Sequence, residues 1–162
     1  MPEIVCDTSP IQYLHQLGLL HLLPAFGRPI VIPPAVENEL IAGKELGIDL
    51  PNFDELHWLS VRSPVSRPAL PLVQDLGPGE TEVLMLGLES PGAVLILDDA
   101  LARRIAETLK IPFTGTLGVL VDGKKAGLIP TIRPFLDQLQ ELRFRVSTAT
   151  RNSVLTLAGE TS

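Results

Sequence analysis

The chain has 162 residues, of which 45% are hydrophobic and 20% are charged. This composition excludes a disordered chain, and the length suits one domain, residues 1–162, with a core of its own. The net charge of −6 argues against a protein that coats nucleic acid, and a single Cys6 excludes an internal disulfide. No apolar run approaches the roughly 20 residues needed to cross a bilayer, so we expect a cytoplasmic protein with no membrane part.

Short apolar strands alternate with helices along the sequence. The first strand is predicted at 3–7, and a helical stretch follows at 10–26, with Ser9 as its N-cap and a break near Gly18. Later strands are predicted at 29–33, 57–61, 93–99 and 111–115. Later helices are predicted at 35–43, closed by Gly43, and at 80–90, 100–110, 116–127, 132–144 and 147–160, with a loop at 62–71.

The predicted strands are apolar on both faces, which is typical of a parallel sheet covered by helices. Right-handed crossovers then give an α/β fold, a three-layer α/β/α sandwich around a short, mainly parallel central sheet. We expect about 145–162 to form a C-terminal helical extension of this domain. In such sheets, ligands bind at the carboxyl ends of the strands.

Acidic residues stand at the ends of two predicted strands. Asp7 ends the first strand, and Asp98 and Asp99 end the fourth. Helical periodicity adds two more acids, because Glu39 shares the core-facing stripe of its helix and Glu80 heads the stripe of the next one. Each acid taken alone has a structural explanation, such as a turn, an N-cap or a favourable place at a helix start.

Glu82 is expected to point outward, because it lies about 200° around the helix from Glu80. The other acids are expected to share one site, and ionised carboxylates gather only where something offsets their mutual repulsion. No Lys, Arg or His has an obvious place among them, so the sequence predicts a divalent cation, Mg²⁺ or Mn²⁺. Such an ion activates water and stabilises charge in phosphoryl displacement, which needs no Ser, His or Cys nucleophile.

The charge is unevenly distributed along the sequence. Residues 1–97 carry 12 acids and 4 bases, whereas residues 98–162 carry 7 acids and 9 bases. The basic residues of the second part either contact phosphate groups or form an ordinary solvated surface, and the pattern alone favours neither interpretation.

The order and spacing of these motifs resemble those of the PIN-domain nucleases. The resemblance rests on Asp7 in "VCDTSP", Glu39 in "IPPAVENEL", Glu80 in "LGPGETEVL", and the segments "LILDDALARRIAETL" and "FTGTLGVLVDGKKAGLIP". It covers nearly the whole chain, and it extends to a PIN-like prokaryotic group related to the VapC-type toxins of VapBC toxin–antitoxin systems. The chain has Glu80 where family sites often have Asp.

The resemblance implies a PIN-like fold and cleavage of RNA phosphodiesters by metal-activated water. It implies that Asp7, Glu39 and Glu80 bind Mg²⁺ or Mn²⁺ and take part in catalysis. Either Asp98 or Asp99 is the fourth acid. We favour Asp99, because it can lie over the carboxyl end of the sheet as the helix starts.

Three hydroxyl residues are auxiliary candidates. Thr116 matches a hydroxyl position near the site in many PIN domains, and an N-cap role is the alternative for it. The same two explanations apply to Thr8 and Ser9.

Two other functions are open on the sequence. The first is a phosphatase of the haloacid-dehalogenase type, but its Asp-x-Asp motif is broken here by Ser9, and Asp98 and Asp99 precede Thr116 and Lys124 instead of following them. The second is a catalytically silent module of the same fold that binds nucleic acid or protein.

The expected partners follow from the same resemblance. RNA is the expected substrate, and the basic segment of an antitoxin is the expected ligand of an acidic cleft in toxins of this kind. We also expect a homodimer, with the apolar stretch 13–23 either at its interface or packed in the core of the single chain.

Overall fold

The centre of the computed structural model, which describes residues 2–65 and 75–160, is a sheet of five parallel strands. The strands are β1 (Ile4–Cys6), β2 (Ile30–Ile32), β3 (Leu59–Val61), β4 (Val94–Ile96) and β5 (Phe113–Thr114). They lie in the order β3-β2-β1-β4-β5. In the middle strand, Val5 pairs with Val31 of β2 and with Leu95 of β4.

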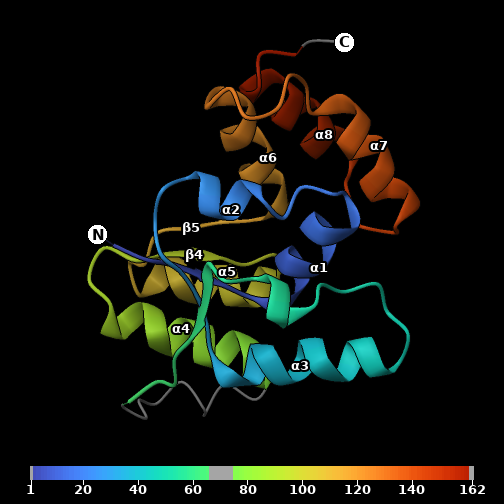
Figure 1. Cartoon of the computed structure of the whole chain (residues 1–162). Helices are drawn as coiled ribbons and strands as arrows, with labels where there is room; N and C mark the ends of the chain where they lie inside the picture. Colours follow the sequence, from blue (N-terminus) through green and yellow to red (C-terminus); the bar gives the residue numbers. More distant parts are fainter. Residues whose placement is uncertain (1, 66–74, 161–162) are drawn as a thin grey trace.

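Helices cover the sheet. They are α1 (Thr8–Gln16), α2 (Leu22–Ala25), α3 (Pro34–Glu45), α4 (Pro78–Glu89), α5 (Ala100–Thr108), α6 (Thr116–Lys125), α7 (Arg133–Glu141) and α8 (Thr148–Leu157), with a short 3-10 helix, η1 (Phe53–Glu55). Figure 1 shows α4 and α5 on one side of the sheet and α2 and α6 on the other. The predicted three-layer α/β/α sandwich with a parallel sheet is therefore confirmed.

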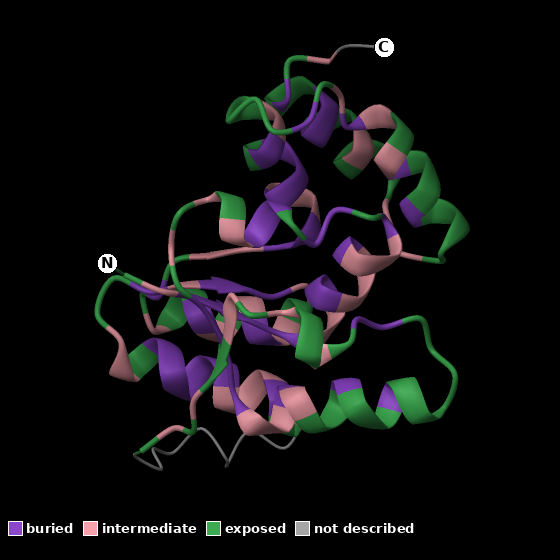
Figure 2. Cartoon of the chain, in the orientation of Figure 1, coloured by how far each residue is buried: buried purple, intermediate pink, exposed green. Residues whose placement is uncertain are grey.

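Strand side chains point alternately to the two helical layers, as the pleat requires. Leu95 faces α4, where a Cβ at Gly87 would lie 3.0 Å from its Cδ2 atom. The next residue, Ile96, lines a pocket together with Val119 of α6. All three side chains are buried, and Figure 2 shows the central strands largely in the colour of buried residues, whereas the edge strands β3 and β5 are intermediate or exposed. Burial on both faces explains why the central strands lack alternating polar residues.

Gly18 and Gly43 were both predicted to end helices, and only the first prediction is confirmed. Gly18 has a φ of +73° and follows α1. Gly43 lies inside α3, which continues to Glu45 before Gly47 takes a φ of +89°. A Cβ at Gly43 would lie 2.8 Å from Leu50 Cδ1, so this glycine permits close packing and does not end the helix.

The apolar stretch 13–23 packs within the chain. Its leucines are buried, with exposures of 8% or less, so of the two predicted roles the structure shows core packing. Within the described residues, no helix is long and apolar enough to cross a membrane. The loop predicted at 62–71 is irregular over 62–65, and the rest of it lies outside the described residues.

The C-terminal helices pack back onto the domain, and α8 contacts α6. Glu160, just beyond α8, accepts hydrogen bonds from the Thr131 hydroxyl and from the N–H groups of Ile132 and Arg133. It also forms an ion pair with Lys124 of α6, with 3.0 Å between Nζ and Oε2. One carboxylate therefore connects the end of the described chain to the start of α7 and to α6.

Candidate active site

Asp7 follows the central strand β1 and is the most buried acid of the carboxyl edge, with only 4% of its surface exposed. Its N–H donates to the Ile96 carbonyl at 3.1 Å, which continues the β1–β4 ladder by one residue. Asp7 is also the N-cap of α1, which begins at Thr8. The prediction that Ser9 is this N-cap is therefore wrong, and Ser9 lies in the first turn of the helix.

Asp98, two residues after β4, is held by three hydrogen bonds. Oδ1 accepts from the Thr116 N–H at 2.8 Å, and Oδ2 accepts from the Thr116 hydroxyl at 2.6 Å and the Ser9 hydroxyl at 3.2 Å. Thr116 is fully buried at the start of α6, after its N-cap Gly115. The hydroxyls of Ser9 and Thr116 therefore lie at the predicted edge of the sheet, where they orient one carboxylate.

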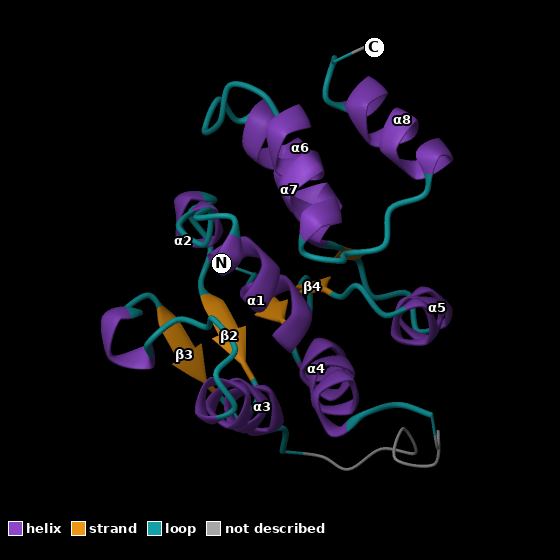
Figure 3. Cartoon of the chain, turned by 90° about the vertical axis from the view of Figure 1, so that its right-hand side faces the viewer, coloured by secondary structure: helices purple, strands orange, loops and turns teal. Residues whose placement is uncertain are grey.

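Glu39 and Glu80 reach the same edge from two helices. Glu39 of α3 accepts a hydrogen bond from the Thr8 hydroxyl at 2.6 Å. Glu80 of α4 turns toward the start of its own helix, where a Cβ at Gly77 would lie 2.5 Å from Oε2. A Cβ at Gly79 would collide with Glu39 Oε1, so α4 approaches α3 closely at this point. Figure 3, turned by 90° about the vertical from Figure 1, shows α1, α3 and α4 beside one another.

The four acids act on one another electrostatically. Burial raises the pKa of Asp7 to about 7, the Thr8 N–H opposes this rise, and the charges of Glu80, Glu39 and Asp98 add to it. Burial also raises the pKa of Glu39, against the hydrogen bond from Thr8 and together with Glu80. Asp7, Glu39, Glu80 and Asp98 are therefore one cluster, which we call the acidic cluster.

Cys6 lies directly beside this cluster but is no part of its chemistry. The side chain is fully buried. Burial raises the pKa of its thiol well above the usual value, and the charges of Asp7 and Asp98 raise it further. The thiol therefore stays protonated and packs as a small apolar group.

Asp99 lies apart from the acidic cluster. Its Oδ2 accepts a hydrogen bond from the Ala102 N–H at 2.9 Å, which makes Asp99 the N-cap of α5, and the residue is exposed. Because β4 ends at Ile96, strand alternation does not decide where the two adjacent acids point. Of the pair, the structure brings Asp98 into the cluster and gives Asp99 a capping role.

The prediction that Glu82 points outward is wrong. Its Oε1 accepts a hydrogen bond from the Ala35 N–H at 3.0 Å, in the first turn of α3. Glu82 also contributes to the raised pKa of Glu39. Helical periodicity places Glu82 and Glu80 on different sides of α4 correctly, but it does not indicate that α3 begins beside Glu82. Every helix start presents unpaired N–H groups that an acid can bind, and the sequence offers no further sign that Glu82 binds those of α3.

The donor set of the cluster fits a hard divalent cation. Its side chains offer only carboxylate and hydroxyl oxygens, which Mg²⁺ and Mn²⁺ prefer. Within the described residues, no Lys, Arg or His forms an ion pair with any of these four carboxylates. In the described part of the chain, however, no three His, Cys, Asp or Glu side chains are already arranged to hold a metal ion together. The chemistry of the donors fits, and the side chains would close in on a bound ion.

The fold and the site define an α/β domain with a parallel sheet and an acidic site at the carboxyl edge of that sheet. A family model described as a PIN domain matches residues 3–160, so the chain belongs to the PIN-domain family. PIN domains are generally nucleases, and this chain therefore has a nuclease fold. The match gives no support to the phosphatase alternative. No curated protein matches the chain.

Gly79→Ala tests the close approach of α4 to Glu39. The added methyl group would displace the Glu39 carboxylate, so we expect nuclease activity to fall about tenfold or more, as small displacements of reacting groups do. The variant should remain folded, because alanine favours a helix interior by about 0.5–1 kcal/mol over glycine. Thermal unfolding and nuclease assays of Gly79→Ala and of Leu88→Ala, an exposed position of the same helix, check this. Full activity in Gly79→Ala would contradict it.

Proposed function

We propose that the chain is a metal-dependent endoribonuclease that hydrolyses RNA phosphodiesters at the acidic cluster. The observation that carries the proposal is the position of the buried Asp7 at the carboxyl edge of the sheet, beside Glu39 and Asp98, whose carboxylates are held by hydroxyl groups at that edge. Membership in the PIN-domain family supports it at the level of a nuclease. A surface of unrelated solvated acids would not place one carboxylate 4% exposed beside three others.

In this proposal, Asp7, Glu39, Glu80 and Asp98 hold one or more Mg²⁺ or Mn²⁺ ions. The bound ion supplies positive charge, polarises the phosphodiester and activates water. The chain's own hydroxyl groups orient the carboxylates: Thr8 donates to Glu39, and Ser9 and Thr116 donate to Asp98. Each of these hydrogen bonds occupies one lone pair and leaves others on the same carboxylate for a cation.

Asp98 replaces Asp99 as the proposed fourth acid. The carboxylate of Asp98 shares the hydroxyl contacts of the cluster and raises the pKa of Asp7, whereas Asp99 caps α5. Thr116, Thr8 and Ser9 are proposed to position carboxylates, and none is proposed as a nucleophile.

The decisive experiment compares RNA cleavage by four proteins in the presence of Mn²⁺. We expect Asp7→Asn and Asp98→Asn to lose activity by about 100-fold or more, since each removes a charged ligand. Asp99→Asn should cleave like the wild type, because asparagine caps helices about as well as aspartate. The measurement is the rate of cleavage of a fluorescent single-stranded RNA, with EDTA-treated protein as the blank.

Three results would contradict the proposal. Equal activity of Asp7→Asn and the wild type would show that the acidic cluster is not the catalytic site. A larger loss in Asp99→Asn than in Asp98→Asn would reverse the assignment of the fourth acid. A folded wild type that neither cleaves RNA nor binds Mn²⁺ by calorimetry would favour the catalytically silent binding module.

The proposed partners go beyond the catalytic proposal. RNA is the proposed substrate, and a relation to VapC-type toxins would add an antitoxin whose basic segment binds the acidic cluster. Size-exclusion chromatography with light scattering tests the proposed homodimer, to which the leucines of the stretch 13–23 are not expected to contribute because they pack in the core.

A further inference from the structure

A hollow runs along α6 and the edge strand β5, starting at the acidic cluster. One pocket of about 460 Å³ contains Asp98 in its wall and lies between α6 and the C-terminal helix α8. A second pocket of about 710 Å³ continues toward the amino ends of β1 and β4. The two pockets share Thr114, Asp122 and Lys125, so they adjoin each other along α6, and we call the pair the α6 trough.

Cations line the trough near the acidic cluster. Arg103 of α5, Lys125 of α6 and Arg145 before α8 all border the pocket that contains Asp98. A Cβ at Gly115 would lie 2.8 Å from Asp98 Oδ1 and 3.5 Å from Arg103 Nη1, so this guanidinium lies next to the carboxylate. Positive charge therefore begins where the acidic cluster ends.

These three cations form no ion pair with a carboxylate, unlike some other basic residues of the described chain. Arg62, Lys124 and Arg151 form ion pairs with Glu3, Glu160 and Asp137. Within residues 2–65 and 75–160, the structure gives Arg103, Lys125 and Arg145 no hydrogen bond or ion pair. Arg103 only stacks over the Phe113 ring, at 5.1 Å from its centroid. The charges of the trough are therefore available to an external anion.

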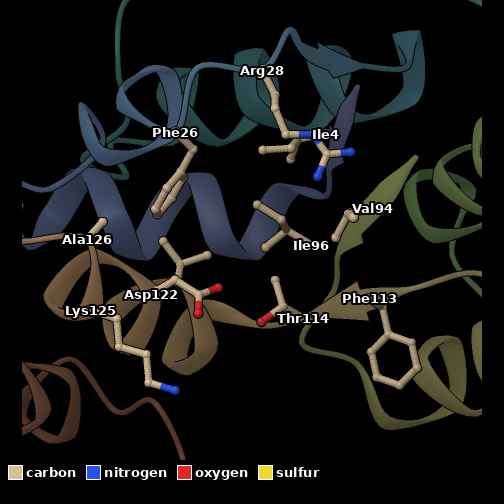
Figure 4. Close-up of a pocket in the computed structure, with 11 residues that line it drawn as sticks. Ile4, Phe26, Arg28, Val94, Ile96, Phe113, Thr114, Asp122, Lys125 and Ala126 are labelled. Atoms are coloured by element: carbon tan, nitrogen blue, oxygen red, sulfur yellow. The ribbon is translucent and has the colours of Figure 1, made fainter. Parts of the chain in front are cut away.

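Aromatic and apolar groups alternate with the cations. Figure 4 shows Phe26 at one side of the second pocket, Ile4 and Ile96 beside it, and Lys125 and Asp122 projecting from α6, while the ring of Phe113 at the far side is directed away from them. Phe144 borders the pocket beside Asp98. Asp122 is the one acid besides Asp98 among the residues that line the trough. Cations with interspersed aromatic rings are the surface that single-stranded nucleic acids bind, through phosphates and base faces.

We infer that the α6 trough holds the single-stranded segment of RNA that extends from the phosphodiester at the acidic cluster, with Arg103, Arg145 and Lys125 binding its phosphates. The inference rests on the proposed function, because it adds a strand path to that same site. It also accounts for the excess of bases after residue 97 in a chain whose net charge is −6. An acidic site repels phosphate, and the adjoining cations offset that repulsion along the strand.

The test measures binding and not cleavage, in EDTA, by fluorescence anisotropy of a labelled single-stranded RNA over a series of salt concentrations. We expect the double variant Arg103→Gln/Arg145→Gln to bind about tenfold more weakly than the wild type at low salt. The slope of log K against log salt should fall by about 1.4, since each phosphate contact on a single strand contributes about 0.7.

The chain offers a matched control in the adjacent arginines. Arg104→Gln/Arg143→Gln removes the same charge from exposed positions that do not line the trough, and it should bind like the wild type. Arg103→Lys/Arg145→Lys keeps the charge and should keep most of the slope, which separates lost charge from disturbed packing at Phe113. Thermal unfolding of each variant confirms that it is folded.

Two results would overturn the inference: an equal loss of affinity in both glutamine double variants, or duplex RNA bound as tightly as single-stranded RNA with the same dependence on Arg103 and Arg145. Binding in EDTA also separates it from the proposed function. Salt-dependent binding through the trough without any cleavage in Mn²⁺ would refute the proposed nuclease activity and support RNA binding in the trough. Cleavage with an unchanged KM in Arg103→Gln/Arg145→Gln would support the nuclease activity and refute RNA binding in the trough.

Discussion

Asp7→Asn is expected to make the metal-free protein more stable at pH 8, by about 2 kcal/mol in the free energy of unfolding. Burial and the neighbouring acids raise the pKa of Asp7 from 3.8 to about 7. At about 1.4 kcal/mol per pKa unit, this shift corresponds to about 4 kcal/mol of destabilisation once the carboxylate is ionised. The buried asparagine amide of the variant lacks a hydrogen-bond partner, which costs about 1–3 kcal/mol and reduces the gain in stability.

The sign of the pH dependence follows from linkage. An acid whose pKa is raised by folding binds its proton more tightly in the native state. Its contribution to stability is complete below pH 3.8, is lost as the pH rises to about 7, and stays lost above that. Urea unfolding in EDTA at pH 5 and pH 8 checks this for the wild type, Asp7→Asn and the control Asp99→Asn. A wild type that is more stable at pH 8 than Asp7→Asn would refute the prediction.

Glu160→Gln is expected to destabilise the protein by about 2 kcal/mol at pH 7, because it weakens charge-assisted hydrogen bonds at a buried helix start. Burial alone would raise the pKa of Glu160, but hydrogen bonds from Thr131, the Ile132 N–H, Lys124 and the Arg133 N–H outweigh it and lower the pKa to about 2. The carboxylate also lies at the N-terminus of α7, where the helix dipole favours a negative charge.

A lowered pKa gives the opposite pH dependence. The stabilisation by Glu160 is complete above pH 4.5 and is lost as the pH falls toward about 2. Thermal unfolding of the wild type and Glu160→Gln should therefore differ strongly at pH 7 and little at pH 2, with the exposed Glu141→Gln of α7 as the control. An equal difference at both pH values would contradict this. The contributions of Asp7 and Glu160 to the stability of the metal-free protein therefore oppose each other in their pH dependence, and their sum is largest at about pH 4.

The strands, their parallel order in an α/β/α sandwich and the gathering of acids were predictable because they follow from local patterns. Continuous apolar runs of three or four residues indicate strands that are buried on both faces, as in a parallel sheet. The carboxyl ends of parallel strands meet at one edge of the sheet, which explains why acids at those ends gather there. Asp7, Glu39 and Glu80 approach that edge as the periodicity of their elements indicates.

The remaining details depend on contacts between elements that are distant in the sequence. The choice between Asp98 and Asp99 is decided by Thr116, eighteen residues away, whose N–H and hydroxyl both bind Asp98. Glu82 turns inward because α3 begins beside it. The trough cations come from α5, α6 and the segment before α8, and no spacing in the sequence brings these together.

The shortness of the strands has a consequence for how this protein can change. Among the described residues no strand exceeds three residues, and the residues that precede the two acids, Cys6 before Asp7 and Leu97 before Asp98, have no exposed surface. A substitution in the centre of the sheet therefore moves a catalytic candidate by itself, and stability and turnover cannot vary independently there. The proposed preference for one RNA over another can diverge instead at the residues of α6 and α8 that border the α6 trough. Libraries that seek new specificity should be confined to those two helices, and libraries that seek stability should avoid the three residues on either side of each acid.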